Sequence, residues 1–535
     1  MMSKIRTCFI AILCVVFLSC GSLHPALTKD KNLSPYDYGL SHARNGEDRY
    51  RILYETHLAA IAAGVDVDYS GIRSIDLEIP RDAKSIPLTT QNDFSGVNFN
   101  VVNKTDKNIF LFTFRGKSVP IEVSKDDIDR GSFKHYPILA QGKHLLVITD
   151  DSPWVEKREG YSYGHERKDI LLIEKGCVIN KTVMPYNNSY SLPSCQYYDL
   201  QVDSVIIANV TLNRSNASES KVYLCAVNGI DNITLRNVEI HTPANDWTSD
   251  VAISIKDCSN VKFDGVKIDG TYSRTNHSGY GVYMDNIWNF QVHNMTAQAN
   301  WGVFGTNNVN VAHFEDSDIN RFDIHCYGRD ISFDNVVFRD KYNQFASVFG
   351  TISFNNCTFI DFVPIVNGPS YNAYVGYDVI MNDCVLKKQR GVTMLIDEGY
   401  IDNRVNKRRE LSDRCLPNVT INNLTLLLGN QVQEVILFYF RQRGLSMQQI
   451  KYLTNITING LNIKYEDGAR TPINLEITNV PIRAITPVHQ IMNNIDIIGN
   501  STRINKNKGR FINRLETTSN KSTVQTSSIK ATSVE

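Results

Sequence analysis

Short runs in which apolar and polar residues alternate dominate the chain from about residue 205 to 390, and each run follows an Asn, Asp or Gly. A turn residue followed by such alternation predicts a half-buried β-strand. The runs fall into two columns whose members recur at spacings between 19 and 29 residues, which indicates an internal repeat. One column begins at Asn232, Asn260, Asn289, Asn310 and Asp330, the second at Asn237, Gly265, Asn294, Asp316, Asn335 and Asn356, and related runs begin at Asn209, Asn418 and Asn455.

Repeats this short cannot bury an apolar face alone. Stacked turns can, because neighbouring strands then lie about 4.8 Å apart and cover one another. Asn or Asp at the same corner of every turn tolerates left-handed backbone angles and can form a ladder of hydrogen bonds. Ahead of the repeats, residues 48–63 carry apolar side chains at helical spacing and end at Gly64, which favours one amphipathic helix. Its apolar positions are Tyr50, Leu53, Tyr54, Leu58 and Ile61.

Over roughly residues 50–500 this pattern resembles the right-handed parallel β-helix proteins of the pectin-lyase-like superfamily. The resemblance implies an all-β fold, a right-handed parallel β-helix solenoid with an N-terminal capping helix that covers the open edge of the first turn. We expect a signal peptide (1–20), a tether (21–45), an N-terminal cap with an irregular β portion (46–200), the core β-helix (201–400), C-terminal β-helix turns (401–500) and a polar, disordered tail (501–535).

The N-terminus reads as an export signal. Lys4 and Arg6 precede a nearly uninterrupted apolar stretch over residues 8–18, which is too short for a membrane-spanning helix. The stretch ends in Leu-Ser-Cys-Gly, which resembles the lipobox of bacterial lipoproteins and implies lipidation of Cys20. The expected location is the bacterial outer membrane or cell surface, held by a lipid anchor. An ordinary cleaved signal peptide and a periplasm-facing position are the alternatives.

Composition narrows the function classes. The 535 residues include 56 basic and 56 acidic ones, so a broadly basic nucleic-acid binder is excluded, and 42% hydrophobic residues exclude wholesale disorder. The eight cysteines after Cys20 are widely scattered without zinc-site spacing, and no acidic cluster has calcium-site spacing. No cofactor or metal is therefore expected, and calcium is left open.

One repeat turn carries the candidate chemistry. From 321 to 329 every odd position is polar and every even one is apolar or Gly, so the odd side chains share one outward face, about 6.6 Å apart, if strand geometry holds. These side chains are Arg321, Asp323, His325, Tyr327 and Arg329. The non-functional alternative is an ordinary solvated face on which Asp323 pairs with Arg321 or Arg329.

Two neighbouring turns predict a depression in the surface beside this cluster. Gly281 and Gly302 occupy what we interpret as the corresponding outward positions and would leave a shallow trough, walled by Tyr283 and Phe304. Other candidates for substrate binding are the alternating residues Tyr161, Tyr163, His165 and Arg167, the loop residue Trp247, and His277. An exposed strand and a Trp that covers its own loop are equally simple interpretations.

A polysaccharide lyase fits this set of side chains. β-Elimination on a uronic acid needs a cation at the carboxylate, a base near the C5 proton and an acid at the leaving oxygen. Arg321 or Arg329 suits the first role and His325 the second, with Asp323 orienting its neighbours. Tyr327 or Tyr283 suits the third. The resemblance to surface lipoproteins of glycan-harvesting systems implies an anionic polysaccharide partner, a glycosaminoglycan such as chondroitin sulfate or hyaluronan first and pectin next.

Two alternatives from other classes stay open. A glycoside hydrolase needs two carboxyl groups about 5–10 Å apart. Asp323 and Asp285 are predicted roughly 16 Å apart, which is too far, whereas Asp246 and Asp250 could pair in a loop. A non-catalytic glycan-binding protein would need only the aromatic trough. The calcium aspartates of pectate lyases and the paired aspartates of polygalacturonases are not recognisable, so no family catalytic residue is carried over.

Overall fold

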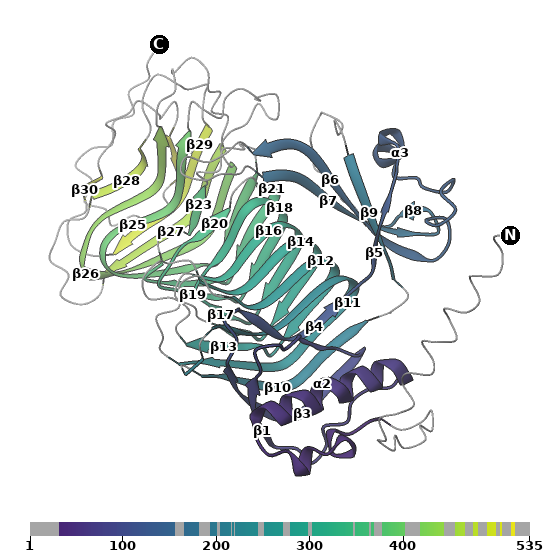
Figure 1. Cartoon of the computed structure of the whole chain (residues 1–535). Coiled ribbons are helices and arrows are strands. Elements are labelled where there is room, and N and C mark those ends of the chain that lie inside the picture. The colour runs from purple at the N-terminus through teal and green to yellow at the C-terminus, as the bar shows by residue number, and fades with distance from the viewer. Residues whose placement is uncertain are drawn as a thin grey trace, which may run out of the picture.

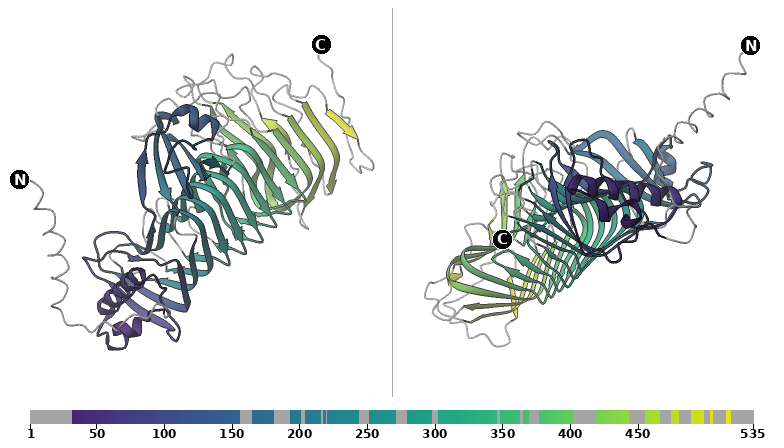
Figure 2. Two further views of the ribbon diagram at one scale, coloured as in Figure 1. Left: turned by 90° about the vertical axis from the view of Figure 1, so that its right-hand side faces the viewer. Right: turned by 60° about the horizontal axis from the view of Figure 1, so that its bottom comes forward.

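The chain forms one long solenoid with helix α2 at one end and a smaller sheet beside it (Figures 1 and 2). This architecture is seen in a computed structural model. The described residues are 32–155, 165–180, 193–200, 204–215, 217–218, 220–243, 251–270, 279–297, 302–345, 348–362, 365–368, 377–401, 418–442, 455–465, 474–479, 489–498, 503–504 and 515–518.

Among these residues, 26 strands join into one continuous sheet that winds into the solenoid, and consecutive rungs pair in parallel. The predicted all-β parallel β-helix is confirmed. The strands are β1 (Ser74–Ile79), β2 (Ile86–Pro87), β3 (Gln91–Asn103), β4 (Ile109–Arg115), β10 (Val205–Arg214), β11 (Val222–Thr242), β12 (Val251–Asp264), β13 (Lys267–Gly270), β14 (Tyr280–His293), β15 (Thr296–Ala297), β16 (Gly302–Glu315), β17 (Asp318–Ile319), β18 (Phe322–Asp334), β19 (Val337–Arg339), β20 (Asn343–Phe345), β21 (Val348–Asn355), β22 (Thr358–Ile360), β23 (Val366–Gly368), β24 (Asp378–Asn382), β25 (Val385–Ile401), β26 (Asn418–Gln442), β27 (Asn455–Tyr465), β28 (Asn474–Asn479), β29 (His489–Ile498), β30 (Arg503–Ile504) and β31 (Leu515–Thr518).

Left-handed residues form the corners of the rungs, as the repeat predicts. In the second column Asn237 and Asn335 have φ of 51° and 56°. The side-chain amide of Asn237 donates to Asn209 Oδ1 of the preceding rung at 3.0 Å, so the corner residues form a hydrogen-bonded ladder. The first column departs from the prediction in one turn, where Val311 rather than Asn310 takes the left-handed angle, with φ of 60°.

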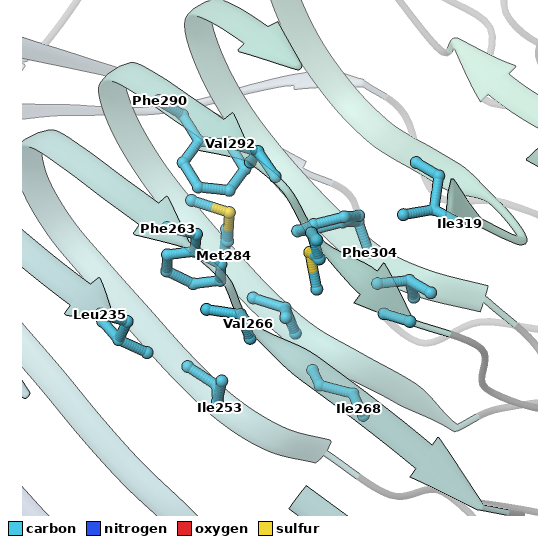
Figure 3. Packing of buried hydrophobic residues seen from close by; sticks show 14 of the residues in the cluster. Leu235, Ile253, Phe263, Val266, Ile268, Met284, Phe290, Val292, Phe304 and Ile319 are labelled. Carbon is cyan, nitrogen blue, oxygen red and sulfur yellow. The ribbon is translucent and has the colours of Figure 1, made fainter. Parts of the chain in front are cut away.

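The interior of the solenoid is a continuous apolar core. Stacked phenylalanines run along it: the rings of Phe333 and Phe354 lie 5.1 Å apart and 7° from parallel, and those of Phe338 and Phe359 lie 5.0 Å and 4°. Figure 3 shows how aliphatic and aromatic side chains from successive rungs fill the space between the strands. Burial of a strand's inner face against the next rung is what stabilises such short strands.

Helix α2 (Gly46–Ala63) covers the first rung, and the predicted capping helix is confirmed. The Asn45 side chain caps its N-terminus by accepting from the Asp48 amide at 2.8 Å, and Gly64 ends it with φ of 67°. Part of the predicted apolar stripe is wrong, because Leu58 and Ile61 are 44% and 46% exposed. The buried stripe runs one residue to the side: Gly46, Tyr50, Leu53, Thr56, His57 and Ala60.

An insertion between β4 and β10 forms a separate five-stranded sheet, which Figure 1 shows beside the solenoid. Its strands pair antiparallel in the order β5-β9-β6-β7-β8. Parallel rungs already begin at β1, so the predicted irregular portion 46–200 contains both solenoid and insertion. The elements are β5 (Ser118–Ile121), α3 (Lys125–Arg130), β6 (Lys143–Val155), β7 (His165–Glu174), β8 (Cys177–Val178) and β9 (Pro193–Asp199), and before α2 come the 3-10 turns η1 (Pro35–Tyr38) and η2 (Leu40–His42).

One face of the inserted sheet docks on the solenoid. Leu145, Leu172 and Tyr198 pack there with Trp288 of β14. In the part of the chain that the structure describes, no helix combines the length and apolarity that crossing a bilayer requires.

Candidate functional site

The candidate site lies on the outer side of four successive rungs, in β12, β14, β16 and β18. Parallel pairing aligns two rows of side chains across them, with residues of successive rungs about 4.8 Å apart. The first row contains Ser254, Tyr283, Gly305 and Asp323. The second contains Lys256, Asp285 and Asn307 and reaches β18 beside His325. Between the rows, Ile255, Met284 and Ile324 point into the core.

A buried ion pair forms the centre of the site. Arg321 Nη2 donates to Asp323 Oδ2 at 2.5 Å, and both side chains are 0% exposed. The guanidinium lies over the Tyr342 ring, 4.3 Å from its centroid, and also donates to Gln344 at 3.3 Å. Asp323 contacts both Arg321 and His325, but Arg321 and Asp323 have no access to solvent, so they do not form the predicted outward face. Arg321 therefore cannot contact a polymer, which corrects its predicted role.

His325 and Tyr280 bring this buried pair to the surface. The Tyr280 hydroxyl donates to Asp323 Oδ2 at 2.8 Å and lies 2.9 Å from His325 Nε2. His325 Nε2 is also 3.2 Å from the same Asp323 oxygen. The His325 side chain is 25% exposed and Tyr280 is half-buried. An imidazole and a phenol in mutual contact thus reach the surface, with a carboxylate behind them.

The environment of Asp323 keeps it ionised. Burial alone raises the pKa of this carboxyl, but the charges of Arg321 and His325 and hydrogen bonds from His325 and Tyr280 lower the pKa below its ordinary value. A negative carboxylate is a strong acceptor for an imidazole N–H and holds the ring in one orientation.

A β-bulge places His325. Thr306 pairs with Ile324, and the next residue, Asn307, pairs with Cys326, so His325 is the extra residue on β18. Bulges of this kind re-aim a side chain and are frequent beside active sites. The strict alternation that the sequence predicts through residue 329 stops at this point.

Gly302 and Gly305 make room for side chains of the cluster, and the trough predicted beside Gly281 and Gly302 is absent from this part of the described structure. A Cβ on Gly302 would lie 3.0 Å from the Arg321 side chain, and one on Gly305 would lie 2.6 Å from the Tyr280 ring. Gly281 faces Ile268 of the core, where a Cβ would approach it to 3.4 Å. The space that we expected for a substrate is occupied by the protein's own side chains.

Phe304 is fully buried and cannot wall a binding surface, so this prediction is wrong. Figure 3 shows its ring among the core side chains. The reason is register: Phe304 aligns with Val282 and Phe322. Equating the Gly-Val pairs of β14 and β16 shifted the predicted alignment by one strand position and so turned Phe304 outward.

The remaining residues of the predicted face separate. Tyr283 stays half-buried in the first row, and its hydroxyl accepts from Asn307 at 3.1 Å. Arg329 pairs in register with Asn310, beyond the corner that Asn308 makes with φ of 48°, and its Nε donates to Asp330 at 3.0 Å. It therefore does not share the face of His325.

Other predicted residues are placed only in part. His165 and Arg167 belong to β7 by their backbone, but their side chains, like that of Tyr327 in β18, are outside the description. Tyr161, Tyr163, Trp247, His277 and Cys20 lie outside the described residues, as do Asp246 and Asp250.

The inserted sheet meets the site face at β7. Lys168 Nζ lies 3.4 Å from Asp285 Oδ2, and its backbone carbonyl accepts from Asn308 at 2.9 Å. Lys256 lies 4.0 Å from the same Asp285 oxygen. Across the described segments, no group of three or more His, Cys, Asp or Glu side chains is arranged to hold a metal ion.

Tyr280, Tyr342, Gln344 and Lys168 are the site residues that sequence reasoning missed. Matching Gly281 with Gly302 implies an inward direction for Tyr280, whereas in the observed register Tyr280 itself pairs with Gly302. Gly305 was the available signal, since its position next to Tyr280 across the rungs leaves space for a ring. Lys168 is far away in sequence, and nothing in the repeat connects it to β14.

Comparison with known proteins supports the fold through one solved structure, a phage tailspike. No protein-family model matches the chain, and no curated protein matches its sequence. Among solved structures, the tailspike gp61 of Pseudomonas phage phi297 is similar over 89% of this chain and 81% of its own, with a TM-score of 0.51 at 10% identity. The tailspike gp49 of Pseudomonas phage LKA1 covers 88% and 81%, with a TM-score of 0.42 at 13% identity. The Thermotoga maritima exopolygalacturonase covers 87% and 93%, with a TM-score of 0.31 at 10% identity.

Proposed function

We propose that the protein cleaves a uronic-acid-containing polysaccharide by β-elimination, with a glycosaminoglycan such as chondroitin sulfate or hyaluronan as the favoured substrate and pectin as the next. The observation that carries the proposal is the contact of 2.9 Å between the phenol of Tyr280 and the imidazole of His325, backed by the buried carboxylate of Asp323. Proton-transfer groups of this kind in mutual reach are what an elimination needs.

The two exposed groups divide the proton transfers between them. His325 takes the C5 proton, the electron pair forms the C4–C5 double bond, and the C4–oxygen bond breaks as Tyr280 gives its proton to the leaving oxygen. The imidazolium Nε2 and the phenolate oxygen then face each other at 2.9 Å, and transfer of the Nε2 proton to the phenolate returns both groups to their neutral forms. Asp323 lies 3.2 Å from His325 Nε2 and orients the imidazole, and the charge of Arg321 helps to keep Asp323 ionised.

A cation that neutralises the substrate carboxylate must be accessible. This requirement removes Arg321 from the role and leaves Arg329, whose side chain is 30% exposed, as the predicted candidate. Arg329 lies beyond the corner of the rung, so it would reach the sugar from the side. Tyr283, held by Asn307 in the first row, is a candidate contact for a sugar ring.

Elimination fits this cluster better than hydrolysis by a pair of carboxyl groups. A glycoside hydrolase places two accessible carboxyl groups about 5–10 Å apart around the scissile bond. Asp323 is fully buried in its ion pair, and Asp285 lies two rungs and two strand positions away, about 12 Å by rung and strand spacing. A non-catalytic glycan binder would have no use for the imidazole–phenol contact.

The export signal extends the proposal to location. Lipidation of Cys20 would hold the enzyme at an outer membrane or cell surface, where a polymer too large to enter the cell is accessible.

The test is an activity panel. Leaderless protein is incubated with chondroitin sulfate, hyaluronan and polygalacturonate, and the unsaturated product is followed by its ultraviolet absorbance. We expect absorbance to rise with at least one polymer and His325→Ala to abolish the rise. His313→Ala is the matched control, because His313 is exposed on another side of the same solenoid and pairs with Asp334 at 3.4 Å. Cleavage without absorbance, or an active His325→Ala variant, would overturn the proposal.

A further inference from the structure

Two lysines share a single carboxylate on the site face. Lys168 of β7 and Lys256 of β12 approach the same oxygen of Asp285, at 3.4 and 4.0 Å. Asp285 is 8% exposed, whereas the side chains of Lys256 and Lys168 are 46% and 26% exposed. One negative charge cannot neutralise two ammonium groups, so the cluster presents net positive charge at the surface.

The neighbouring carboxylate, that of Asp257, has hydrogen-bond partners of its own. Asp257 is buried and faces the insertion, where it accepts from Tyr198 at 3.2 Å and from Asn286 at 2.8 Å. Burial raises the pKa of Asp257, and the charge of Lys256 opposes this rise.

Lys256 lies on the row that ends beside His325, and Lys168 reaches the same row from β7. Register places Lys256, Asp285 and Asn307 on consecutive rungs, with His325 beside the row on the next. Three intervals of about 4.8 Å separate the Lys256 and His325 rungs by about 14 Å. A stretched polymer that runs along the solenoid axis over this row would pass both places.

We propose that Lys256 and Lys168 form a binding site for an anionic group of the polysaccharide, a carboxylate or a sulfate, several sugar residues away from the cleaved bond. This inference rests on the proposed function and adds to it the direction of the chain, parallel to the solenoid axis across β12, β14, β16 and β18. Lys256 is the more accessible member, because its contact with Asp285 is 4.0 Å long and its side chain is 46% exposed. Lys168 is fixed through β7, whose backbone carbonyl accepts from Asn308.

The test measures binding to the inactive His325→Ala protein by calorimetry, with short and long oligosaccharides of hyaluronan, which carries carboxylates only, and of chondroitin sulfate, which adds sulfates. Lys256→Met is expected to weaken binding of long oligosaccharides about three- to fivefold, the range of one exposed charge contact, and to leave short ones unchanged. Lys262→Met is the matched control: it lies on the same strand, is 50% exposed and has one carboxylate at 3.9 Å.

Asp285→Asn should change the affinity for long oligosaccharides in the opposite direction. It removes the competing carboxylate, so long oligosaccharides should bind more tightly, a result that a folding defect cannot produce. The relative losses on the two polymers show whether carboxylate or sulfate is bound. Equal affinities for Lys256→Met, Lys262→Met and the parent overturn this site and leave the proposed elimination standing. Failure of the parent to bind either polymer overturns this site, whereas the proposed elimination is decided separately by the activity panel, which includes polygalacturonate.

Discussion

At the scale of single residues, the Arg321–Asp323 pair is the most demanding feature of the site. Taking two charges out of water is expensive, and the pair persists only because each charge has a partner. Burial of this kind gives little net stability, so we interpret the pair as a device that orients His325 and Tyr280. Contacts of the Arg321 guanidinium with Tyr342 and Gln344 offset part of the cost of burying the pair.

Removing one partner should be much worse than removing both. Arg321→Met leaves the Asp323 carboxylate buried without its counter-charge and should lower the free energy of unfolding by about 3–5 kcal/mol. The double variant Arg321→Met with Asp323→Leu should recover much of that loss but stay inactive. Denaturant titration of both variants measures this, and an Arg321→Met protein as stable as the parent would contradict the buried pair.

The sequence predicts which residues form this cluster better than it predicts where they lie. Alternation places Arg321 and Asp323 on one side of the strand, where they form an ion pair, whereas His325 reaches Asp323 from a β-bulge that alternation does not predict. Alternation could not show that the Tyr280 ring lies against Gly305 and contacts Asp323 and His325. The pairing of residues between neighbouring rungs depends on where each corner begins. A shift of one position turned Phe304 outward and Tyr280 inward, since strand side chains alternate with a period of two.

At the scale of elements, helix α2 carries a titratable group in its buried stripe. His57 is fully buried with Nε2 2.8 Å from the Tyr69 hydroxyl, and burial lowers its pKa from 6.5 to about 4. The unfolded chain therefore binds a proton more readily than the folded one between these values. The stabilising contribution is fully present above about pH 6.5 and is lost as the pH falls towards 4.

This gives a pH-dependent prediction. Between pH 6.5 and 4 the parent should lose about 3 kcal/mol of unfolding free energy through His57 alone, and His57→Gln should flatten that part of the profile. Unfolding free energies measured across this range test it. An unchanged slope in His57→Gln would show that the cap does not bury a neutral imidazole.

The corner at Val311 offers a second test at this scale. Neighbouring corners hold Asn289 and Asp330 with φ of 59° and 49°, residues that tolerate the left-handed angle, whereas Val311 has a β-branched side chain at φ of 60°. Val311 is 38% exposed, so little packing is lost on replacement. Val311→Asn should raise the unfolding free energy by about 1 kcal/mol, and a thermal midpoint below that of the parent would contradict the assigned corner.

The sequence predicts secondary-structure elements correctly where the same short motif repeats along the chain. The second Asn column and the corners of the rungs follow from a turn residue before each alternating run, and they needed no tertiary information. The antiparallel insertion gave no comparable signal, because its strands pair across loops of varied length. Leu58 and Ile61 show the same limit in α2: a helix that covers an end buries only a narrow stripe.

At the scale of the whole molecule, the insertion is fixed to the solenoid by an apolar contact beside charged ones. Leu172, 2% exposed, packs toward Trp288, and Lys143 of β6 forms an ion pair with Asp231 of β11. This docking places β7 and Lys168 on the site face. The insertion is therefore part of the site, although it is absent from the repeat.

A charge in this contact should loosen the insertion and leave the solenoid folded. Leu172→Asp buries a carboxylate against Trp288, which is costly without a partner. Limited proteolysis should then cut within residues 117–200 much faster, with the solenoid still resistant. Ile179→Asp, at a position that is 48% exposed in the same insertion, should behave like the parent. Equal protection in both variants would contradict the docking.

The central claim is that the Tyr280–His325 pair cleaves an anionic polysaccharide by elimination, and the mass of the products tests it most directly. Elimination splits the chain without consuming water, so one product carries a double bond and the product masses sum to that of the substrate. Hydrolysis adds one water. The account predicts the unsaturated product from the parent enzyme and its loss in Tyr280→Phe. Products that contain the added water would contradict it.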